Sequence, residues 1–208
     1  MAYSKATLTA LKQKLADKIA AGVVPTSSTT LSYWTRMLND GQQYCADKLR
    51  LTKSASKTTT GATSTTAGSI VMNDDFILID KVVDADGNQL IQISKEDSIP
   101  HISSGGNVFW ITGNHFDDFY LNTPSNDTYT VYYTFRPSEM SSDSDECIIP
   151  DPLAVVCYAY SKLRMAQTDP LEDADKEMGE CNRRLDEVMS ARIFNEEGGL
   201  KLKLQPNA

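Results

Sequence analysis

The sequence predicts an α+β fold: a helical bundle built from N-terminal and C-terminal helices, with an inserted small antiparallel β module. Residues 1–50 and 138–197 carry apolar positions at helical spacing. The middle, 51–137, alternates apolar and polar residues between turns rich in Gly, Asn, Asp and Pro. Residues 198–208 follow the last predicted helix as an extended C-terminal arm.

The composition excludes several classes of protein. The 208 residues carry 20 Lys and Arg against 28 Asp and Glu, a net charge of −8, and mean hydropathy is −0.36. No stretch approaches the roughly 20 apolar residues that cross a bilayer, and the start of the chain lacks the apolar run of a signal peptide. An acidic chain is also a poor binder of the phosphate backbone, so bulk-charge binding of nucleic acid is not expected.

The first 50 residues predict two helices. Leu8, Leu11, Leu15 and Ile19 recur at helical spacing, and Gly22 and Pro25 end that helix. Residues 26–30 offer N-cap hydroxyls for a second helix from about 31 to 49. Its apolar stripe consists of Leu31, Trp34, Leu38, Cys45 and Leu49, with Met37 and Tyr44 beside it. Gly41 in mid-helix indicates close packing against a neighbour, because glycine costs about 1 kcal/mol there relative to alanine.

Serine and threonine dominate residues 52–69, which we expect to form a protruding loop or a hairpin turning near Gly61, mobile in the free protein. Strands are predicted at 76–83, 89–93, 107–112, 119–121 and 129–135, which makes a module of four or five strands. The first two are expected to pair across the turn at 84–88. That turn resembles a calcium loop, but its twelfth position is Lys95 rather than a carboxylate, so a hairpin turn is favoured.

The C-terminal part predicts two more helices. Asp151 and Pro152 have the pattern of an N-cap followed by a first-turn proline, and the wide apolar band that follows predicts a helix buried on more than one side. The last helix runs from about 171 to 194. The arm then alternates strictly, a pattern that could add a strand to a partner. The candidate docking residues are Leu200, Lys201, Leu202, Lys203 and Leu204.

No residue pattern indicates catalysis, a metal or a cofactor. Cys45, Cys147, Cys157 and Cys181 have no metal-ligand spacing and are expected to be buried, reduced thiols. His101 and His115 lack further ligands, and phosphate-loop and nucleophile-elbow motifs are absent from the sequence. Paired aspartates such as Asp74–Asp75 and Asp117–Asp118 fit turns. We therefore expect a protein that is not an enzyme.

The charge is unevenly spread along the chain. Residues 1–57 hold nine basic and three acidic side chains, net +6, whereas 58–139 hold three and eleven, net −8, and 140–197 hold six and fourteen, net −8. Ordinary solvated faces would explain this distribution. The alternative is that a basic face and an acidic face meet in an assembly.

The order of elements resembles that of the head-to-tail adaptor (connector) proteins of short-tailed bacteriophages. The resemblance covers roughly residues 31–188. It rests on N-D-D-F-I-L-I-D at 73–80 with the D-G-N turn, V-Y-Y-T-F-R-P at 131–137, and S-S-D-S-D-E-C-I-I-P-D at 141–151 before the closing helices. The Ser/Thr-rich segment and the Leu-Lys arm depart from the family pattern.

The resemblance implies a structural virion protein of the neck, assembled in the bacterial host cytoplasm. Copies, expected to be twelve, would form a ring under the portal protein, join head to tail, and extend the channel through which DNA leaves without specific binding. Tail or nozzle proteins would be further partners. The arm would dock on the portal or on a neighbouring subunit. The candidate tail- or portal-facing loop consists of Thr58, Thr59, Thr60, Gly61 and Thr63.

Two alternatives stay open at the level of sequence. One is another tail-completion or stopper protein of the virion neck, which would share the composition. The other is a virion-associated peptidoglycan hydrolase, for which Glu139 and Glu146 are the candidate carboxylates.

Overall fold

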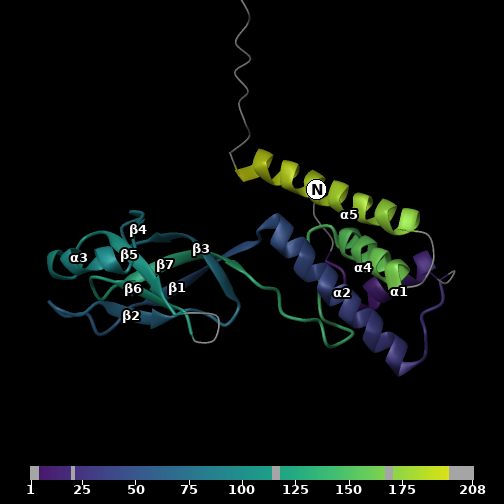
Figure 1. Ribbon diagram of the computed structural model, residues 1–208, viewed down its shortest axis with the longest axis horizontal. Helices are drawn as coiled ribbons and strands as arrows, with labels where there is room; N and C mark the ends of the chain where they lie inside the picture. The colour runs from purple at the N-terminus through teal and green to yellow at the C-terminus, as the bar shows by residue number, and fades with distance from the viewer. Residues whose placement is uncertain (1–4, 20–21, 114–117, 167–170, 197–208) are drawn as a thin grey trace, which may run out of the picture. The chain divides into compact units, whose positions relative to one another are not determined.

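The computed structural model describes residues 5–19, 22–113, 118–166 and 171–196 (Figure 1). The chain divides into two compact units. Residues 1–49 and 137–208 make one, here called the helical unit, and residues 50–136 make the other, here called the β unit. The architecture is a mixture of helices and largely antiparallel sheets, which confirms the predicted α+β class.

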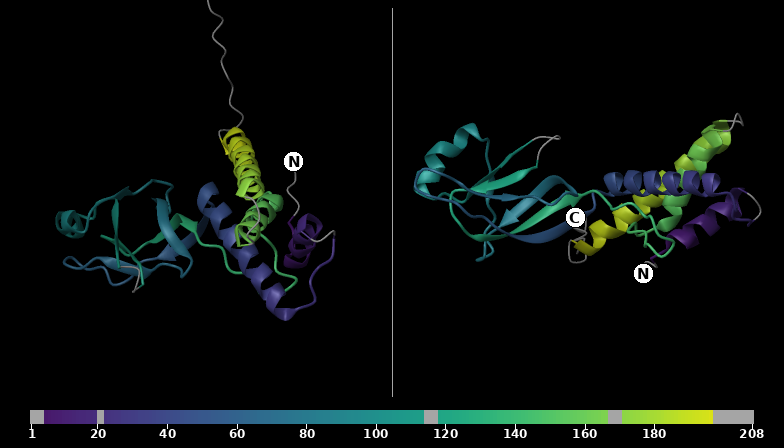
Figure 2. Two further views of the ribbon diagram at one scale, coloured as in Figure 1. Left: turned by 45° about the vertical axis from the view of Figure 1, so that its right-hand side comes forward. Right: turned by 90° about the horizontal axis from the view of Figure 1, so that it is seen from below.

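The helical unit is organised around one shared helix. Its helices are α1 (Leu8–Ile19), α2 (Ser28–Leu49), α4 (Pro152–Ala166) and α5 (Leu171–Glu196), and α4 contacts each of the other three (Figure 2). Ala154, Val155, Val156, Cys157 and Ala159 of α4 are all buried. The prediction of a helix buried on more than one side is confirmed, and the burial of this band removes apolar surface from water and so stabilises the unit.

Close helix packing explains Gly41. A Cβ at this position of α2 would lie 2.9 Å from the backbone oxygen of Val155 in α4. One turn further along, the rings of Tyr44 and Tyr158 stack with centroids 4.8 Å apart, and the Tyr44 hydroxyl donates to Asn182 of α5. The expectation that Gly41 marks a close approach is therefore confirmed.

The described residues of the β unit form seven strands, more than the four or five predicted. They are β1 (Thr52–Thr58), β2 (Gly68–Val71), β3 (Phe76–Val83), β4 (Ile91–Gln92), β5 (Val108–Thr112), β6 (Tyr120–Thr123) and β7 (Thr128–Phe135). One sheet has the order β1-β7-β3 and the other β2-β6-β5-β4. A separate core, which includes Val82, Phe109, Leu121, Val131 and Tyr133, lies within this unit.

Most of the segment 52–69 is strand that pairs outside the segment, and the predicted hairpin pairing near Gly61 is limited to the antiparallel bridge between Thr60 and Ser69. β1 pairs along its whole length with β7, and β2 pairs with β6, so the two strands enter different sheets. The reason is visible in the alternation of β1. Lys53, Ala55 and Lys57 are half-buried, while Ser54 and Ser56 are exposed, the period-2 pattern of a half-buried strand.

The pairing predicted between 76–83 and 89–93 is confirmed only next to the turn, where Val83 and Gln89 form an antiparallel bridge and the Leu90 N–H donates to the Val82 carbonyl at 2.9 Å. Only Ile91–Gln92 form a strand, and β4 pairs in parallel with β5. A short helix, α3 (Ile99–Ser104), follows β4 and was not predicted; with six residues it is too short to show helical periodicity.

Candidate functional site

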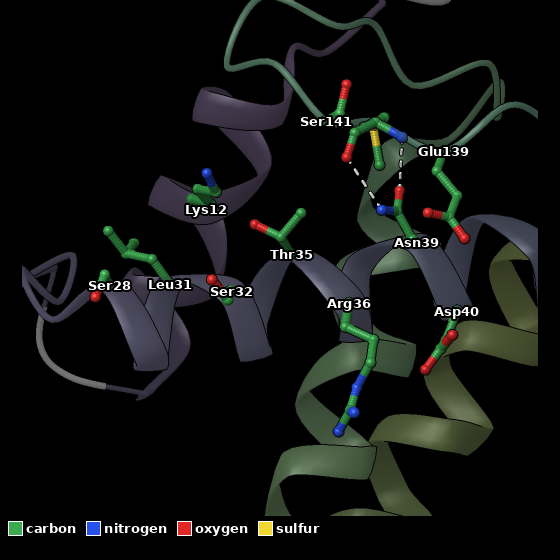
Figure 3. Close-up of a pocket in the computed structure, with 11 residues that line it drawn as sticks. Lys12, Ser28, Leu31, Ser32, Thr35, Arg36, Asn39, Asp40, Glu139 and Ser141 are labelled. Carbon is green, nitrogen blue, oxygen red and sulfur yellow. Dashed lines mark hydrogen bonds between the residues drawn. The ribbon is translucent and has the colours of Figure 1, made fainter.

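A polar groove opens on the helical unit where α1, α2 and the segment after the β unit meet (Figure 3). Its volume is about 530 Å³. Most of its lining is hydroxyl, amide or charged: Lys12, Ser28, Leu31, Ser32, Thr35, Arg36, Asn39, Asp40, Glu139, Met140 and Ser141. This lining suits contact with a polar surface rather than an apolar ligand.

Two amide side chains of α2 hold the segment that forms one wall of this groove. Asn39 makes two bonds to Met140, donating to its carbonyl at 3.0 Å and accepting from its N–H at 2.9 Å. Gln42, which is 2% exposed, donates to the Ser138 carbonyl at 3.0 Å and accepts from the Ile148 N–H at 3.1 Å. Sequence reasoning missed both residues, because an amide on a helix gives no periodic signal.

The basic start of the chain is paired inside the helical unit. Lys5 binds Glu146 at 2.8 Å, Lys12 binds Asp143 at 2.8 Å, and Lys18 binds Glu177 at 2.6 Å. Burial acts to lower the Lys18 pKa, but the bonds and charges around it, Glu177 above all, leave the pKa raised. Part of the charge asymmetry therefore serves the fold of one subunit, and these three lysines do not need an acidic partner chain.

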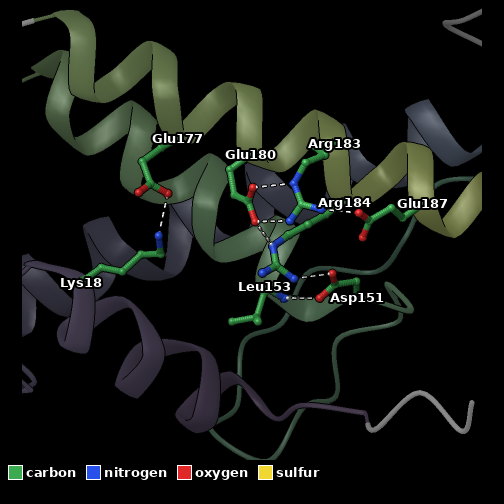
Figure 4. A network of polar contacts seen from close by, with 8 residues as sticks. All are labelled: Lys18, Asp151, Leu153, Glu177, Glu180, Arg183, Arg184 and Glu187. Carbon is green, nitrogen blue, oxygen red and sulfur yellow. Dashed lines mark hydrogen bonds and ion pairs between the residues drawn. The ribbon is translucent and has the colours of Figure 1, made fainter.

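A denser network links α5 to the start of α4 (Figure 4). Asp151 accepts from the Leu153 N–H at 3.0 Å as the N-cap of α4, and its other oxygen accepts from Arg184 of α5 at 2.8 Å. Glu180 pairs with both Arg183 and Arg184, and the bond from Arg183, followed by the two guanidinium charges, lowers the pKa of Glu180 to about 2. The predicted cap is confirmed, and it joins two helices as well as capping one.

The carboxylates proposed for a hydrolase do not lie in the environment that general-acid catalysis needs. Glu139 is exposed on the rim of the polar groove, and Glu146 is exposed and bound to Lys5. A catalytic acid requires an apolar pocket that raises its pKa. The arrangement of Glu139 and Glu146 therefore gives no support to hydrolysis.

The predicted loop at 58–63 is tied into the β unit. Thr59 is fully buried and donates to the Ser125 carbonyl at 2.9 Å, and the Thr60 N–H donates to Ser69. Thr58, Thr60, Gly61 and Thr63 are exposed, and Gly61 adopts φ +85°. The other predicted docking residues, Leu200, Lys201, Leu202, Lys203 and Leu204, lie outside the described residues.

The aspartate-rich turn between β3 and β4 binds its own backbone. The Asp84 carboxylate accepts from the N–H groups of Asp86 and Asn88 at 3.0 and 2.7 Å, and from the Asn88 side chain. These bonds, that from the Asn88 side chain first, lower the Asp84 pKa. The turn reading is confirmed, and no group of three metal-ligating side chains occurs within the part of the chain that the structure describes.

The cysteines are free thiols. All four are buried, and burial raises the pKa of Cys147 to about 11 and of Cys157 to about 12. A thiol with such a pKa holds its proton at neutral pH and is a poor nucleophile. The expectation of buried thiols is confirmed.

Comparison with known proteins assigns the family. The sequence model of the SU10 adaptor protein family matches residues 6–198, which include both units. The search among curated proteins returned no match. None of the described helices is both long and apolar enough to span a membrane. The fold and the family model agree with a structural role in a phage particle at the head–tail junction, and the chain belongs to the SU10 adaptor protein family.

Proposed function

We propose that copies of this chain form a ring under the portal of a short-tailed phage and extend the DNA channel toward the tail. The observation that carries the proposal is the family match over 6–198, which spans the helical unit, the β unit and the segments joining them. A ring of twelve would match the symmetry of a portal. Its copies would contact one another through two different surfaces, as closed rings of identical subunits do.

The distribution of charge supports a channel that DNA passes without binding. Lys5, Lys12 and Lys18 are paired with carboxylates of the same helical unit. The rest of the chain keeps an acidic excess, because the net charge is −8. An acidic wall repels phosphate and provides no counterion release on contact with DNA.

The polar groove is the surface we propose for the portal or a tail component. Its hydroxyl, amide and charged groups can exchange water for a polar partner, as the rim of a non-obligate interface does. The wall that contains Met140 is anchored by Asn39, so the groove is preformed.

The test is assembly on purified portal rings, followed by electron microscopy and by native mass measurement. We expect the chain alone to be a monomer, and to form a ring on the portal without any other neck protein. A stopper would bind only after an adaptor had already joined the portal. Failure to bind the portal alone would overturn the proposal, as would a ring whose acidic side chains point away from the lumen.

A further inference from the structure

We propose that β1 is an acceptor edge that receives residues 200–204 of a neighbouring copy as an added strand. The two edge strands of the β1-β7-β3 sheet differ in the regularity of their pairing with β7. β3 carries two register shifts, between Phe76 and Leu78 and between Ile79 and Lys81. β1 pairs with β7 over seven residues without any shift.

Exposed sheet edges attract foreign strands, and proteins normally protect them with bulges, proline or outward charges. The bulges of β3 protect that edge. β1 has no proline, and its two lysines lie on the half-buried face of the sheet and not along its open edge. There Lys53 pairs with Asp75, and Lys57 donates to Asn73 at 2.6 Å. Within the described residues no further strand pairs with β1 beyond β7.

The hydrogen-bond pattern identifies which groups of β1 are available. At the ends of the ladder, the Phe135 N–H donates to Leu51 and the Thr59 N–H donates to Asp127, so odd-numbered residues of β1 bond to β7. In an antiparallel ladder the alternate residues point their N–H and C=O groups the other way. The backbones of Ser54 and Ser56 therefore face the open edge, and their side chains are exposed and uncharged.

The arm of this chain has the pattern that such an edge accepts. Leu200, Leu202 and Leu204 alternate with Lys201 and Lys203, and two glycines precede them. Residues 197–208 can span about 40 Å when extended. A strand beside β1 must put one set of side chains next to Lys53, Ala55 and Lys57, and like charges directly opposite are destabilising. The leucines consequently take that face, where Ala55 already contacts the core, and the lysines take the face of Ser54 and Ser56.

The donor and the acceptor are different parts of the chain, so exchange between neighbours propagates head to tail, which is the contact that a closed ring uses. The inference that the exchange closes a ring rests on the proposed function. Main-chain bonds would supply the affinity, and the leucines would supply the register.

The test is amide hydrogen exchange on the full chain, with a synthetic peptide of residues 197–208 as the probe. We expect saturating peptide to slow exchange at Ser54 and Ser56 at least tenfold, while the amides of Lys53, Ala55 and Lys57 keep their rates because they already bond to β7. A peptide with all three leucines changed to serine should not protect these amides, and one with both lysines changed to serine should still do so.

A matched pair of chain variants isolates the backbone. Ser56→Pro removes one outward N–H and should abolish peptide binding, whereas Ser56→Ala changes only the side chain and should retain it. Exchange on the unaltered chain decides the question even if Ser56→Pro does not fold.

The inference would be overturned if millimolar peptide gave no protection, or if it protected only another strand. It would also be overturned if Ser54 and Ser56 were already protected without peptide in dilute protein, to an extent independent of protein concentration. That third result would mean that the arm pairs within its own chain. Portal binding by a full chain with the three leucines changed to serine separates the two proposals. If that variant still forms a ring, the function stands without the strand exchange.

Discussion

At the scale of single residues, two glycines in helices have opposite surroundings. Gly41 lies in α2 against the backbone of Val155, with no room for a methyl group at 2.9 Å. Gly179 lies in α5, exposed, with nothing within 4 Å of where its Cβ would be. Substitution of either glycine by alanine would stabilise its helix by up to about 1 kcal/mol through helix propensity. Only Gly41 would also force two helices apart, a strain of about 1–3 kcal/mol.

We therefore predict that Gly41→Ala lowers the free energy of unfolding by about 1–2 kcal/mol, because overpacking outweighs helix propensity. Gly179→Ala is the matched control and should raise it by up to about 1 kcal/mol. Urea unfolding followed by circular dichroism measures both. Equal effects of the two substitutions would show that α2 and α4 can move apart at no cost, contrary to the close approach in the structure.

At the scale of elements, α2 fixes the path of the connecting segment through Gln42. This buried amide satisfies the Ser138 carbonyl and the Ile148 N–H, which are ten residues apart. Gln42→Ala leaves both backbone groups without that partner, and each costs about 1–3 kcal/mol when it stays buried. We predict a total loss of about 2–4 kcal/mol in the free energy of unfolding.

Gln43→Ala is the control for that prediction. Gln43 is the next residue, and within the part of the chain that the structure describes its amide donates to Asp47, one turn along the same helix, at 2.8 Å. Such a contact is worth a few tenths of a kcal/mol. Denaturant titration of the two variants should separate them by at least about 1.5 kcal/mol. A Gln42 variant as stable as the Gln43 variant would mean that water replaces the two bonds of Gln42.

The elements that sequence predicted well are those with a local signal. The helices at Leu8–Ile19 and Pro152–Ala166 follow from apolar spacing and from capping residues close in the chain. The partners of the strands do not follow from such signals. β1 pairs with β7, whose residues lie 70 to 82 positions further along the chain, and the residue types of Ser54 and Ser56 do not indicate that partner. The anchoring role of Gln42 was hidden for the same reason, since both its partners are about 100 residues away.

At the scale of the whole molecule, the two units differ in how the chain builds them. The β unit is continuous, residues 50–136, with its own apolar core around Val82, Val131 and Tyr133. The helical unit is discontinuous, because α1 and α2 precede the β unit and α4 and α5 follow it. Continuity in sequence lets a unit fold without the rest of the chain, whereas a discontinuous unit needs both of its parts.

A fragment of residues 50–136 should therefore fold alone, with dispersed amide resonances and a cooperative thermal transition, because a domain of this size can bury enough apolar surface. A fragment of residues 1–49 should stay largely unfolded, since Leu11, Leu15, Trp34 and Leu38 are buried in a unit whose central helix is α4. Adding a second fragment, residues 137–208, should restore helix content in proportion to the amount of complex that the two fragments form. Circular dichroism during a titration measures this helix content. An unfolded β fragment would show that its core depends on the helical unit. A folded 1–49 fragment would show that the first two helices do not need α4.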